Sequence, residues 1–290
     1  VGVSVSDNAA TGVVSGIRSV SYKVTSLGQQ TQTGDLYTYT ATAGSLNDLT
    51  KSVSRNFTVD AGLNNSNDVQ IEVTAVDNAG NTYKTTNVIK IDITAPTIEI
   101  SYDNNSGDTT FGDDTYFKES RTATVKVTER NFDPAKVIPV IEASAGGVPS
   151  ISGWTTASGS GNGDDTVNIA TIYYGNDADY TFNISAEDIA GNKSGDVNYG
   201  NSLAPTKFTV DKTVPVISVV YDNNNAAEAG FYKEQRTATV TIQEHNFETS
   251  RVVLTMNATD NGNPASAPTI SGWSGSGDTH TATISFASDA

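Results

Sequence analysis

The sequence predicts an all-β protein built from tandem antiparallel sandwiches. Apolar and polar residues alternate with period two in several segments, and no helical stripe of useful length occurs. Whole blocks also recur, so that "ISGW" ends at Trp154 and again at Trp273, 119 positions later. Strands with period-two alternation bury one face and leave the other in water, as antiparallel sandwich strands do.

Composition supports thin domains with small cores and excludes several classes of protein. Apolar residues make up 36% of the 290 residues, below the roughly 45–50% usual in globular chains. The net charge of −16 argues against nucleic-acid partners and anionic membranes, and favours a soluble surface protein or one that holds cations. No cysteine is present, which excludes disulfides and thiol chemistry. No apolar run reaches the roughly 20 residues that span a membrane.

Repeats divide the chain into three units, residues 1–91, 92–210 and 211–290. "RTATVKVTERNF" from Arg121 matches "RTATVTIQEHNF" from Arg236, and "AVDNAGN" from Ala75 matches "AEDIAGN" from Ala186. Each boundary carries Asp, Thr and Pro in the pattern D-x-T-x-P, which predicts a short stiff linker because proline holds the residue before it extended. The copied stretches are interpreted as structural units rather than as a catalytic signature.

The predicted strands follow one another along each unit. The alternating segments are Val69–Ala75, Ala123–Val127, Tyr180–Ala186 and Ala238–Ile242. "FDPAKV" predicts a single helical turn with Asp133 as N-cap and Pro134 in the first position. About seven short strands in each 90–119 residues predict immunoglobulin-like (Ig-like) sandwiches arranged as an elongated rod. Of two adjacent tyrosines on one strand, Tyr173 and Tyr174, one must face outward.

The third unit is expected to be incomplete in the sequence given. Thr283–Ala290 matches Thr171–Ala178, and the two strands that follow in the second unit have no counterpart. We therefore expect half a core and an unpaired strand edge in residues 211–290, to be covered by further strands of a longer protein or by another chain. The chain begins at Val1 without Met, and we expect it to be an internal fragment of a longer secreted protein.

No catalytic centre is predicted. Only His245 and His280 are present, both expected at the surface, and neither a nucleophile motif nor a phosphate-binding loop occurs. Trp154 and Trp273 could stack on sugar rings, but their matched positions favour core packing, and Phe132 and Phe247 are expected to plug the core beneath a turn. The prediction is that the chain is not an enzyme and has no organic cofactor.

Calcium is the one cofactor for which the sequence offers ligands. In an Ig-like sandwich, the loops after the second and the second-last strands lie near the incoming linker, and the loop after the first strand lies near the outgoing one. Two junctions then gather carboxylate and amide oxygens, which suit a hard cation with six to eight ligands. Alternatively, D-x-A-G-N is only a turn, with Asn and Gly at positive φ, and the linker Asp caps its own turn. The candidate ligands are Asp7, Asp68, Asp92, Glu129, Asn131, Asp188 and Asn192 at the first junction, and Asp103, Asn104, Asp177, Asp211, Glu244 and Asn246 at the second.

The strand, D-x-A-G-N turn, strand and D-x-T-x-P order resembles the tandem bacterial Ig-like repeats of large Gram-positive cell-surface proteins. "DNAGN", "DIAGN", "DITAP" and "DKTVP" carry the resemblance, which covers nearly the whole chain. It implies an extracellular location, at the bacterial surface or secreted, and a role as stalk or adhesin, because some such proteins bind host proteins including immunoglobulins. Three hypotheses stay open: a spacer and adhesin stalk, a specific binder of a host protein such as immunoglobulin, and an accessory sugar-binding module of a secreted glycanase.

Overall fold

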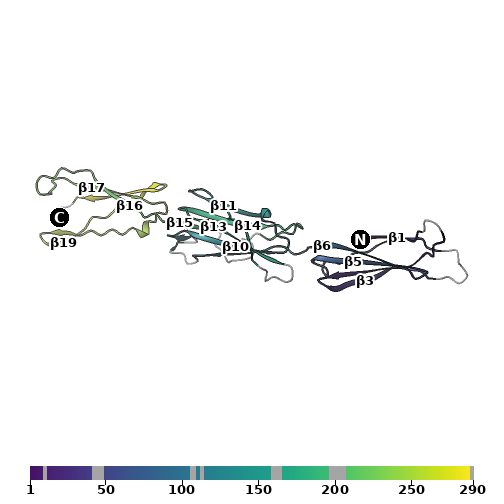
Figure 1. The fold of residues 1–290 in the computed structure, drawn as a ribbon. Helices are drawn as coiled ribbons and strands as arrows, with labels where there is room; N and C mark the ends of the chain where they lie inside the picture. Colours follow the sequence, from purple (N-terminus) through teal and green to yellow (C-terminus); the bar gives the residue numbers. More distant parts are fainter. Residues whose placement is uncertain are drawn as a thin grey trace. The chain divides into compact units, whose positions relative to one another are not determined.

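The computed structural model describes residues 1–8, 12–40, 49–104, 109–111, 114–157, 165–195 and 207–287 (Figure 1). The described residues form strands and two short 3₁₀ helices, which confirms the all-β prediction. The chain divides into two compact units, Val1–Asp211 and Lys212–Ala290. The first unit contains two groups of sheets, residues 1–91 and 92–211. Within the described part, no helix is long and apolar enough to cross a membrane.

Residues 1–91 fold into two sheets. One is the antiparallel pair β1–β4 and the other has the order β3-β2-β5-β6. The two sheets enclose a core around Val3, Ile17, Val20 and Val53, to which apolar residues at alternate strand positions contribute. The strands are β1 (Gly2–Ser6), β2 (Ile17–Ser26), β3 (Gln29–Thr38), β4 (Ser52–Asn56), β5 (Ser66–Asp77) and β6 (Thr82–Ile91).

Residues 92–211 form a larger pair of sheets, β12-β13-β10-β7 and β11-β14-β15-β9-β8. Every second residue of β10, from Arg121 to Glu129, is buried, as the period-two pattern predicts. The predicted helical turn is also present: Asp133 accepts a hydrogen bond from the Ala135 amide and caps a 3₁₀ helix, η1. The elements are β7 (Thr97–Tyr102), β8 (Thr109–Phe111), β9 (Asp114–Phe117), β10 (Arg121–Glu129), η1 (Pro134–Lys136), β11 (Val137–Ala143), β12 (Thr155–Ala157), β13 (Thr166–Tyr174), β14 (Ala178–Ala186) and β15 (Lys207–Val210).

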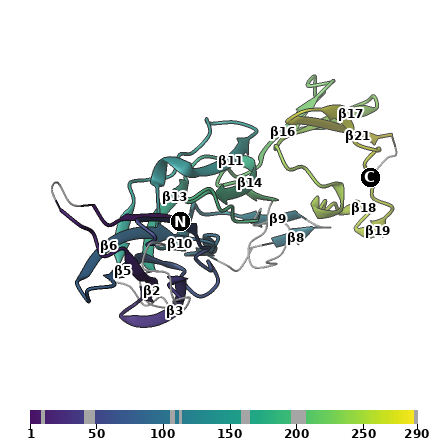
Figure 2. The same cartoon turned by 90° about the vertical axis from the view of Figure 1, so that its right-hand side faces the viewer.

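The second unit has one four-stranded sheet, β16-β17-β21-β20, and the small hairpin β18-β19 (Figure 2). Its inner face is largely open. Ile217 of β16 is 63% exposed, whereas Ile98 at the matching position of β7 is 7% exposed, because β14 and β15 cover the core only in residues 92–211. The elements are β16 (Val216–Tyr221), β17 (Arg236–Gln243), η3 (Thr249–Arg251), β18 (Ala258–Asp260), β19 (Asn263–Ala265), β20 (Ser274–Ser276) and β21 (Thr279–Phe286).

An open groove of about 1050 Å³ lies on this uncovered face. Ile217, Val219, Val240, Ile284 and Trp273 line part of it, and they are the residue types that form a closed core in residues 92–211. Among the described residues of Lys212–Ala290, one face of the core is therefore uncovered, which is the half core expected of residues 211–290.

The strand pairings show which strands of the two sandwiches correspond. One copy of the D-x-A-G-N turn joins β5 to β6, and the other copy follows β14. β5 and β6 therefore correspond to β14 and β15. β2 pairs with β5 as β11 pairs with β14, and β1 pairs with β4 as β10 pairs with β13. Thus β1 takes the place of β10, which is the second main strand of its sandwich, rather than the place of β7.

The core of residues 92–211 contains a cation that the sequence analysis did not anticipate. Arg121 is 1% exposed, and its guanidinium carbon lies 3.7 Å from the ring centroid of Phe117 and 3.9 Å from that of Tyr102. Arg121 Nε donates to the Asn104 carbonyl oxygen over 3.0 Å. Aromatic faces attract the charge that burial would otherwise penalise. Arg236 lies in the same way over Tyr221, 3.8 Å from its centroid, so this packing is part of the repeat.

Candidate metal centre at the junction of residues 1–91 and 92–211

The D-x-A-G-N sequence forms the same closed turn twice. Asp77 accepts from the Asn81 amide and side chain, both over 2.7 Å, and Asp188 accepts from the same groups of Asn192, both over 2.8 Å. Gly80 and Gly191 have φ of 93° and 94°, which only glycine adopts without strain. The turn interpretation is therefore correct for both copies, except that Asn81 and Asn192 are not at positive φ.

The two turns differ in burial. Asp188 is fully buried, whereas Asn81 is exposed and Asp77 is half-buried. Asn192 also donates to the Asp92 carbonyl oxygen over 3.1 Å, so this turn contacts the linker that precedes its own sandwich. The second copy of the turn is therefore part of the junction as well as a link between strands.

Asp92 is the linker residue at the centre of the junction. Its Oδ1 accepts from the Thr94 amide over 3.0 Å, as expected for an aspartate that caps its own turn. The same oxygen lies 3.0 Å from Arg130 Nη2, and the two side chains are 3% and 8% exposed. Asn131 Nδ2 donates to the other carboxylate oxygen of Asp92. The Asp92 carboxylate is thus buried and compensated by one guanidinium.

Arg130 and two asparagines join the two sandwiches. Arg130 Nη1 donates to the Asn65 carbonyl oxygen over 3.0 Å, and Arg130 Nη2 donates to the Ile91 carbonyl oxygen over 3.3 Å. Asn67 Nδ2 donates to Asn131 Oδ1 over 3.0 Å, while Asn67 Oδ1 is buried and accepts no hydrogen bond. Sequence reasoning missed Arg130, Asn65 and Asn67, because no periodicity marks contacts between separate sandwiches.

Three carboxylates meet at this junction. Asp92, Glu129 and Asp188 each present an oxygen within 4.8 Å of the others. Oxygens that share one Ca²⁺ at about 2.4 Å each can be at most about 4.8 Å apart, so the group fits a single cation. Two of these residues, Glu129 and Asp188, are 3% and 0% exposed. Arg130 supplies one positive charge against three carboxylates, which leaves a buried excess of negative charge if all are ionised.

The Glu129 carboxyl responds to this excess of negative charge by a raised pKa. Burial raises the pKa of the Glu129 carboxyl, and the negative charges of Asp92 and Asp188 raise it further, although the Asn131 amide, which donates to Oε1 over 2.8 Å, lowers it. A carboxyl in this setting is neutralised either by a proton or by a bound cation.

Two predicted ligands of this junction, Asp7 and Asp68, are not part of the group of three carboxylates. Asp7 Oδ2 accepts from the Gly16 amide over 2.7 Å, and the Gly16 carbonyl accepts from the Asn78 amide, at the opposite end of the β5–β6 hairpin from Asp92. The prediction counted β1 as a first strand, whereas it occupies the second-strand place, so the residue after it lies at the other end. Asp68 is exposed, and its oxygens accept from Gln70.

The second predicted group divides between the two compact units. Asp103, Asp177 and Asp211 belong to the first unit, at the end of the sandwich where β13 turns into β14. β7 and β15 end there, at Tyr102 and Val210, and β14 begins there, at Ala178. Asp103 Oδ1 accepts from the Thr122 amide over 2.8 Å. Glu244 belongs to the second unit, and its Oε1 accepts from the Asn246 amide over 3.0 Å, as Glu129 does from Asn131.

The aromatic candidates pack inward. Trp154 contacts Phe132 edge to face with ring centroids 5.0 Å apart, and Trp273 contacts Phe247 in the same way at 5.1 Å. Both tryptophans are half-buried against their cores, which agrees with the core interpretation. Tyr173 is 61% exposed and Tyr174 is fully buried, as alternation requires.

The histidines also take ordinary positions. His245 Nδ1 lies 2.9 Å from Asp278 Oδ1 at an exposed site, and the His280 ring stacks on Phe247 with centroids 4.1 Å apart. His245 is therefore at the surface, as predicted, whereas His280 packs partly inside.

No protein-family model matches this chain, and no curated protein matches it either.

Proposed function

We propose that this chain is a non-enzymatic part of a bacterial cell-surface protein, in which tandem Ig-like domains form an elongated stalk for adhesion or host-protein binding. The proposal combines the sequence resemblance with one structural observation, the buried carboxylate group at a hydrogen-bonded junction. A spacer must hold neighbouring domains in a fixed relative orientation. Buried polar contacts specify that orientation better than a flexible linker does.

Calcium is the proposed occupant of the junction. Asp92, Glu129 and Asp188 would supply carboxylate oxygens. Asn131, which donates to Asp92, would add an amide oxygen after a rotation of its side chain. The cation would neutralise the charge that Arg130 leaves uncompensated and would bind β6, β10 and the loop after β14 into one joint.

Small-angle scattering in calcium and in chelator tests this joint. We expect the maximum dimension to stay well defined in calcium and its distribution to broaden in chelator. The Glu129→Gln variant should behave in both buffers as the wild type does in chelator. An unchanged distribution for the wild type would leave the junction fixed by proline and Arg130 alone, and would refute a calcium joint.

Host-protein binding is the second part of the proposal. The partner is a host surface or secreted protein, with immunoglobulin as the named candidate by resemblance. The half-buried positions of Trp154 and Trp273 favour this interpretation over a sugar-binding module, which would need exposed rings.

The immobilised chain should retain purified immunoglobulin or another member of a panel of host serum and mucosal proteins, with a saturable signal. A mixture of soluble glycans is the comparison. Retention of a glycan but of no protein on the panel would contradict the proposal and support the accessory-module alternative.

A further inference from the structure

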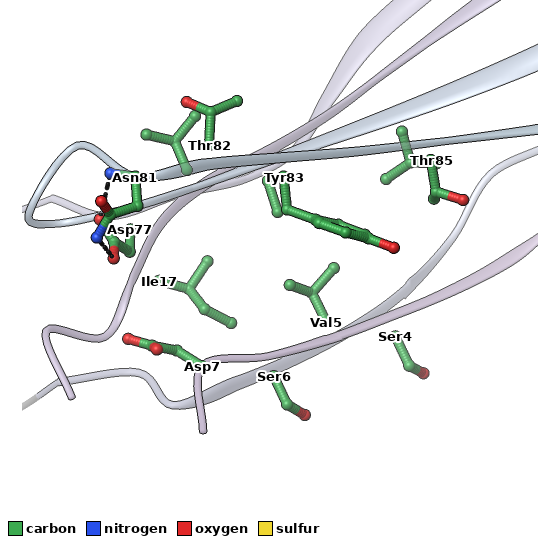
Figure 3. A pocket seen from close by; sticks show the side chains of 13 residues that line it. Ser4, Val5, Ser6, Asp7, Ile17, Asp77, Asn81, Thr82, Tyr83 and Thr85 are labelled. Atoms are coloured by element: carbon green, nitrogen blue, oxygen red, sulfur yellow. Dashed lines mark hydrogen bonds between the residues drawn. The ribbon is translucent and has the colours of Figure 1, made fainter. Parts of the chain in front are cut away.

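A pocket of about 350 Å³ opens at one end of residues 1–91, between the edge strands β1 and β6 (Figure 3). Val5, Ile17 and Tyr83 form part of its apolar wall, and Asp7 and Asp77 stand at its polar end. Tyr83 is 72% exposed. Among the described residues, no strand pairs with the second edge of β1 or with the second edge of β6.

The corresponding edges of residues 92–211 are both covered. β10, which matches β1, pairs with β7 on its second edge, so that Val127 faces Ile98 and Val125 faces Ile100. β15, which matches β6, pairs with β9 in parallel, so that Val210 faces Phe117. One continuous stretch of chain, which begins at the linker and runs through β7 to β9, therefore covers both edges.

The burial of matching residues shows the effect of this cover. Val127 is fully buried under Ile98, whereas Val5, which has the matching place on β1, is only half-buried. Phe208 and Val210 of β15 are buried, whereas the matching Ile89 and Ile91 of β6 are half-buried. The pocket is thus the space that an Ile98-like side chain occupies in the other sandwich.

We propose that this pocket and the free edge of β1 form an acceptor site for a β-strand of the pattern D-x-T-x-P-x-I-x-I-x-Y, the pattern of Asp92–Tyr102. The strand would pair antiparallel to β1, as β7 pairs with β10, and its first isoleucine would fill the pocket over Val5 and Tyr83. Main-chain hydrogen bonds supply affinity in this mode of recognition, and the pockets for alternate side chains supply specificity.

The acidic end of the pocket supports the same occupant. Asp7 directly follows β1, and Glu129 is the last residue of β10. Asp77 forms the turn that Asp188 forms in the other sandwich. An aspartate at the start of the incoming strand would stand where Asp92 stands, and it would complete a second group of three carboxylates. The inference concerns strand binding, so it does not depend on calcium at the first junction.

A synthetic peptide tests the site. DITAPTIEISYDN, residues 92–104 of this chain, is added to the full 290-residue protein, and hydrogen exchange is followed peptide by peptide. We expect saturable protection of Gly2–Asp7, by about tenfold in exchange rate, at peptide concentrations below about 1 mM. A peptide with Ile98→Asp and Ile100→Asp should give no protection.

Two matched protein variants locate the binding. Tyr83 lines the pocket and is exposed, so Tyr83→Ser should fold normally and weaken peptide binding several-fold. Val88 is exposed on the same strand, 54% in solvent, but does not line the pocket, so Val88→Ser should leave binding unchanged.

Three results would overturn the proposal: no protection at about 1 mM peptide, protection confined to β10 or to the second unit, or equal effects of Tyr83→Ser and Val88→Ser. Edge-to-edge dimers of the chain through β1, seen by sedimentation and resistant to the peptide, would assign the edge to a second copy and would also overturn it.

Discussion

Replacing Glu129 by Gln should stabilise the protein in the absence of calcium. Glu129 is 3% exposed, and its carboxylate lies within 4.8 Å of the Asp92 and Asp188 oxygens. Two unit charges about 4.8 Å apart repel by about 3.5 kcal/mol at an effective dielectric constant of about 20. Arg130 offsets about one of the two repulsions, and relaxation of the side chains reduces the other, which leaves a gain of about 1–2 kcal/mol for Gln.

The expected result is a higher melting temperature in chelator. A gain of about 1–2 kcal/mol in a domain of about 120 residues raises the melting temperature by about 4–8 °C. Gln keeps the oxygen that accepts from the Asn131 amide, so the variant removes charge rather than a hydrogen bond. The control is Glu99→Gln, because the Glu99 side chain is 65% exposed and forms an ion pair with Lys126, and we expect less than about 1 kcal/mol of change.

The pH dependence gives a second check with a definite sign. The folded-state pKa of Glu129 is raised above its ordinary value of 4.5, so the folded protein binds the proton more tightly than the unfolded chain does. Its contribution to stability is fully present below pH 4.5 and is lost as the pH rises through the raised folded value. Glu129→Gln should remove this fall. A variant that is less stable than the wild type in chelator at neutral pH would refute the reasoning, because it would mean that the ionised carboxylate stabilises the fold.

Three further predictions concern single contacts and the open core. Arg130→Met leaves Asp92 buried without its cation, and it should cost about 3–5 kcal/mol in thermal unfolding, against about 0–1 kcal/mol for Lys126→Met at an exposed pair; equal losses would contradict the burial argument. Asn192→Ala removes the side-chain donor to the buried Asp188 and to the Asp92 carbonyl oxygen, and it should cost about 1–3 kcal/mol. Asn81→Ala in the exposed copy of the turn should lower the melting temperature less, and the reverse order would contradict the burial argument. The synthetic peptide ADYTFNISAEDIAGN, residues 178–192, should bind the groove of Lys212–Ala290 and raise the melting temperature of that unit, and a peptide with Tyr180→Ser and Phe182→Ser should not; no shift with the first peptide would mean that β14-type strands do not complete this core.

Much of the fold follows from local sequence patterns. Period-two alternation predicts β10 and its copy β17, and Asp133 with Pro134 predicts the capped 3₁₀ turn. The D-x-A-G-N turn is also predictable, because its closing hydrogen bonds join residues only four positions apart. Patterns of this kind report interactions within one element or one turn.

The sequence did not predict the position of β1 within its sandwich or the contacts between the two sandwiches. β1 is short and its sequence matches no other block, so its place as a second strand, and with it the location of Asp7, depends on pairing with β4 some 50 residues away. Arg130 meets Asn65 across 65 positions, and no periodicity reports such a contact. Arg121 did have a signal, because it shares the alternating face of Ala123 and Val125, but a cation on that face is normally taken for the end of a strand.

Titration calorimetry with calcium is the most direct test of the proposed junction. We expect a saturable heat of binding for the wild-type chain at neutral pH, with at least one site whose heat is lost in Glu129→Gln and retained in Glu99→Gln. A wild-type chain that gives no heat up to millimolar calcium, or a Glu129→Gln variant that binds calcium as the wild type does, would contradict calcium at the group of Asp92, Glu129 and Asp188.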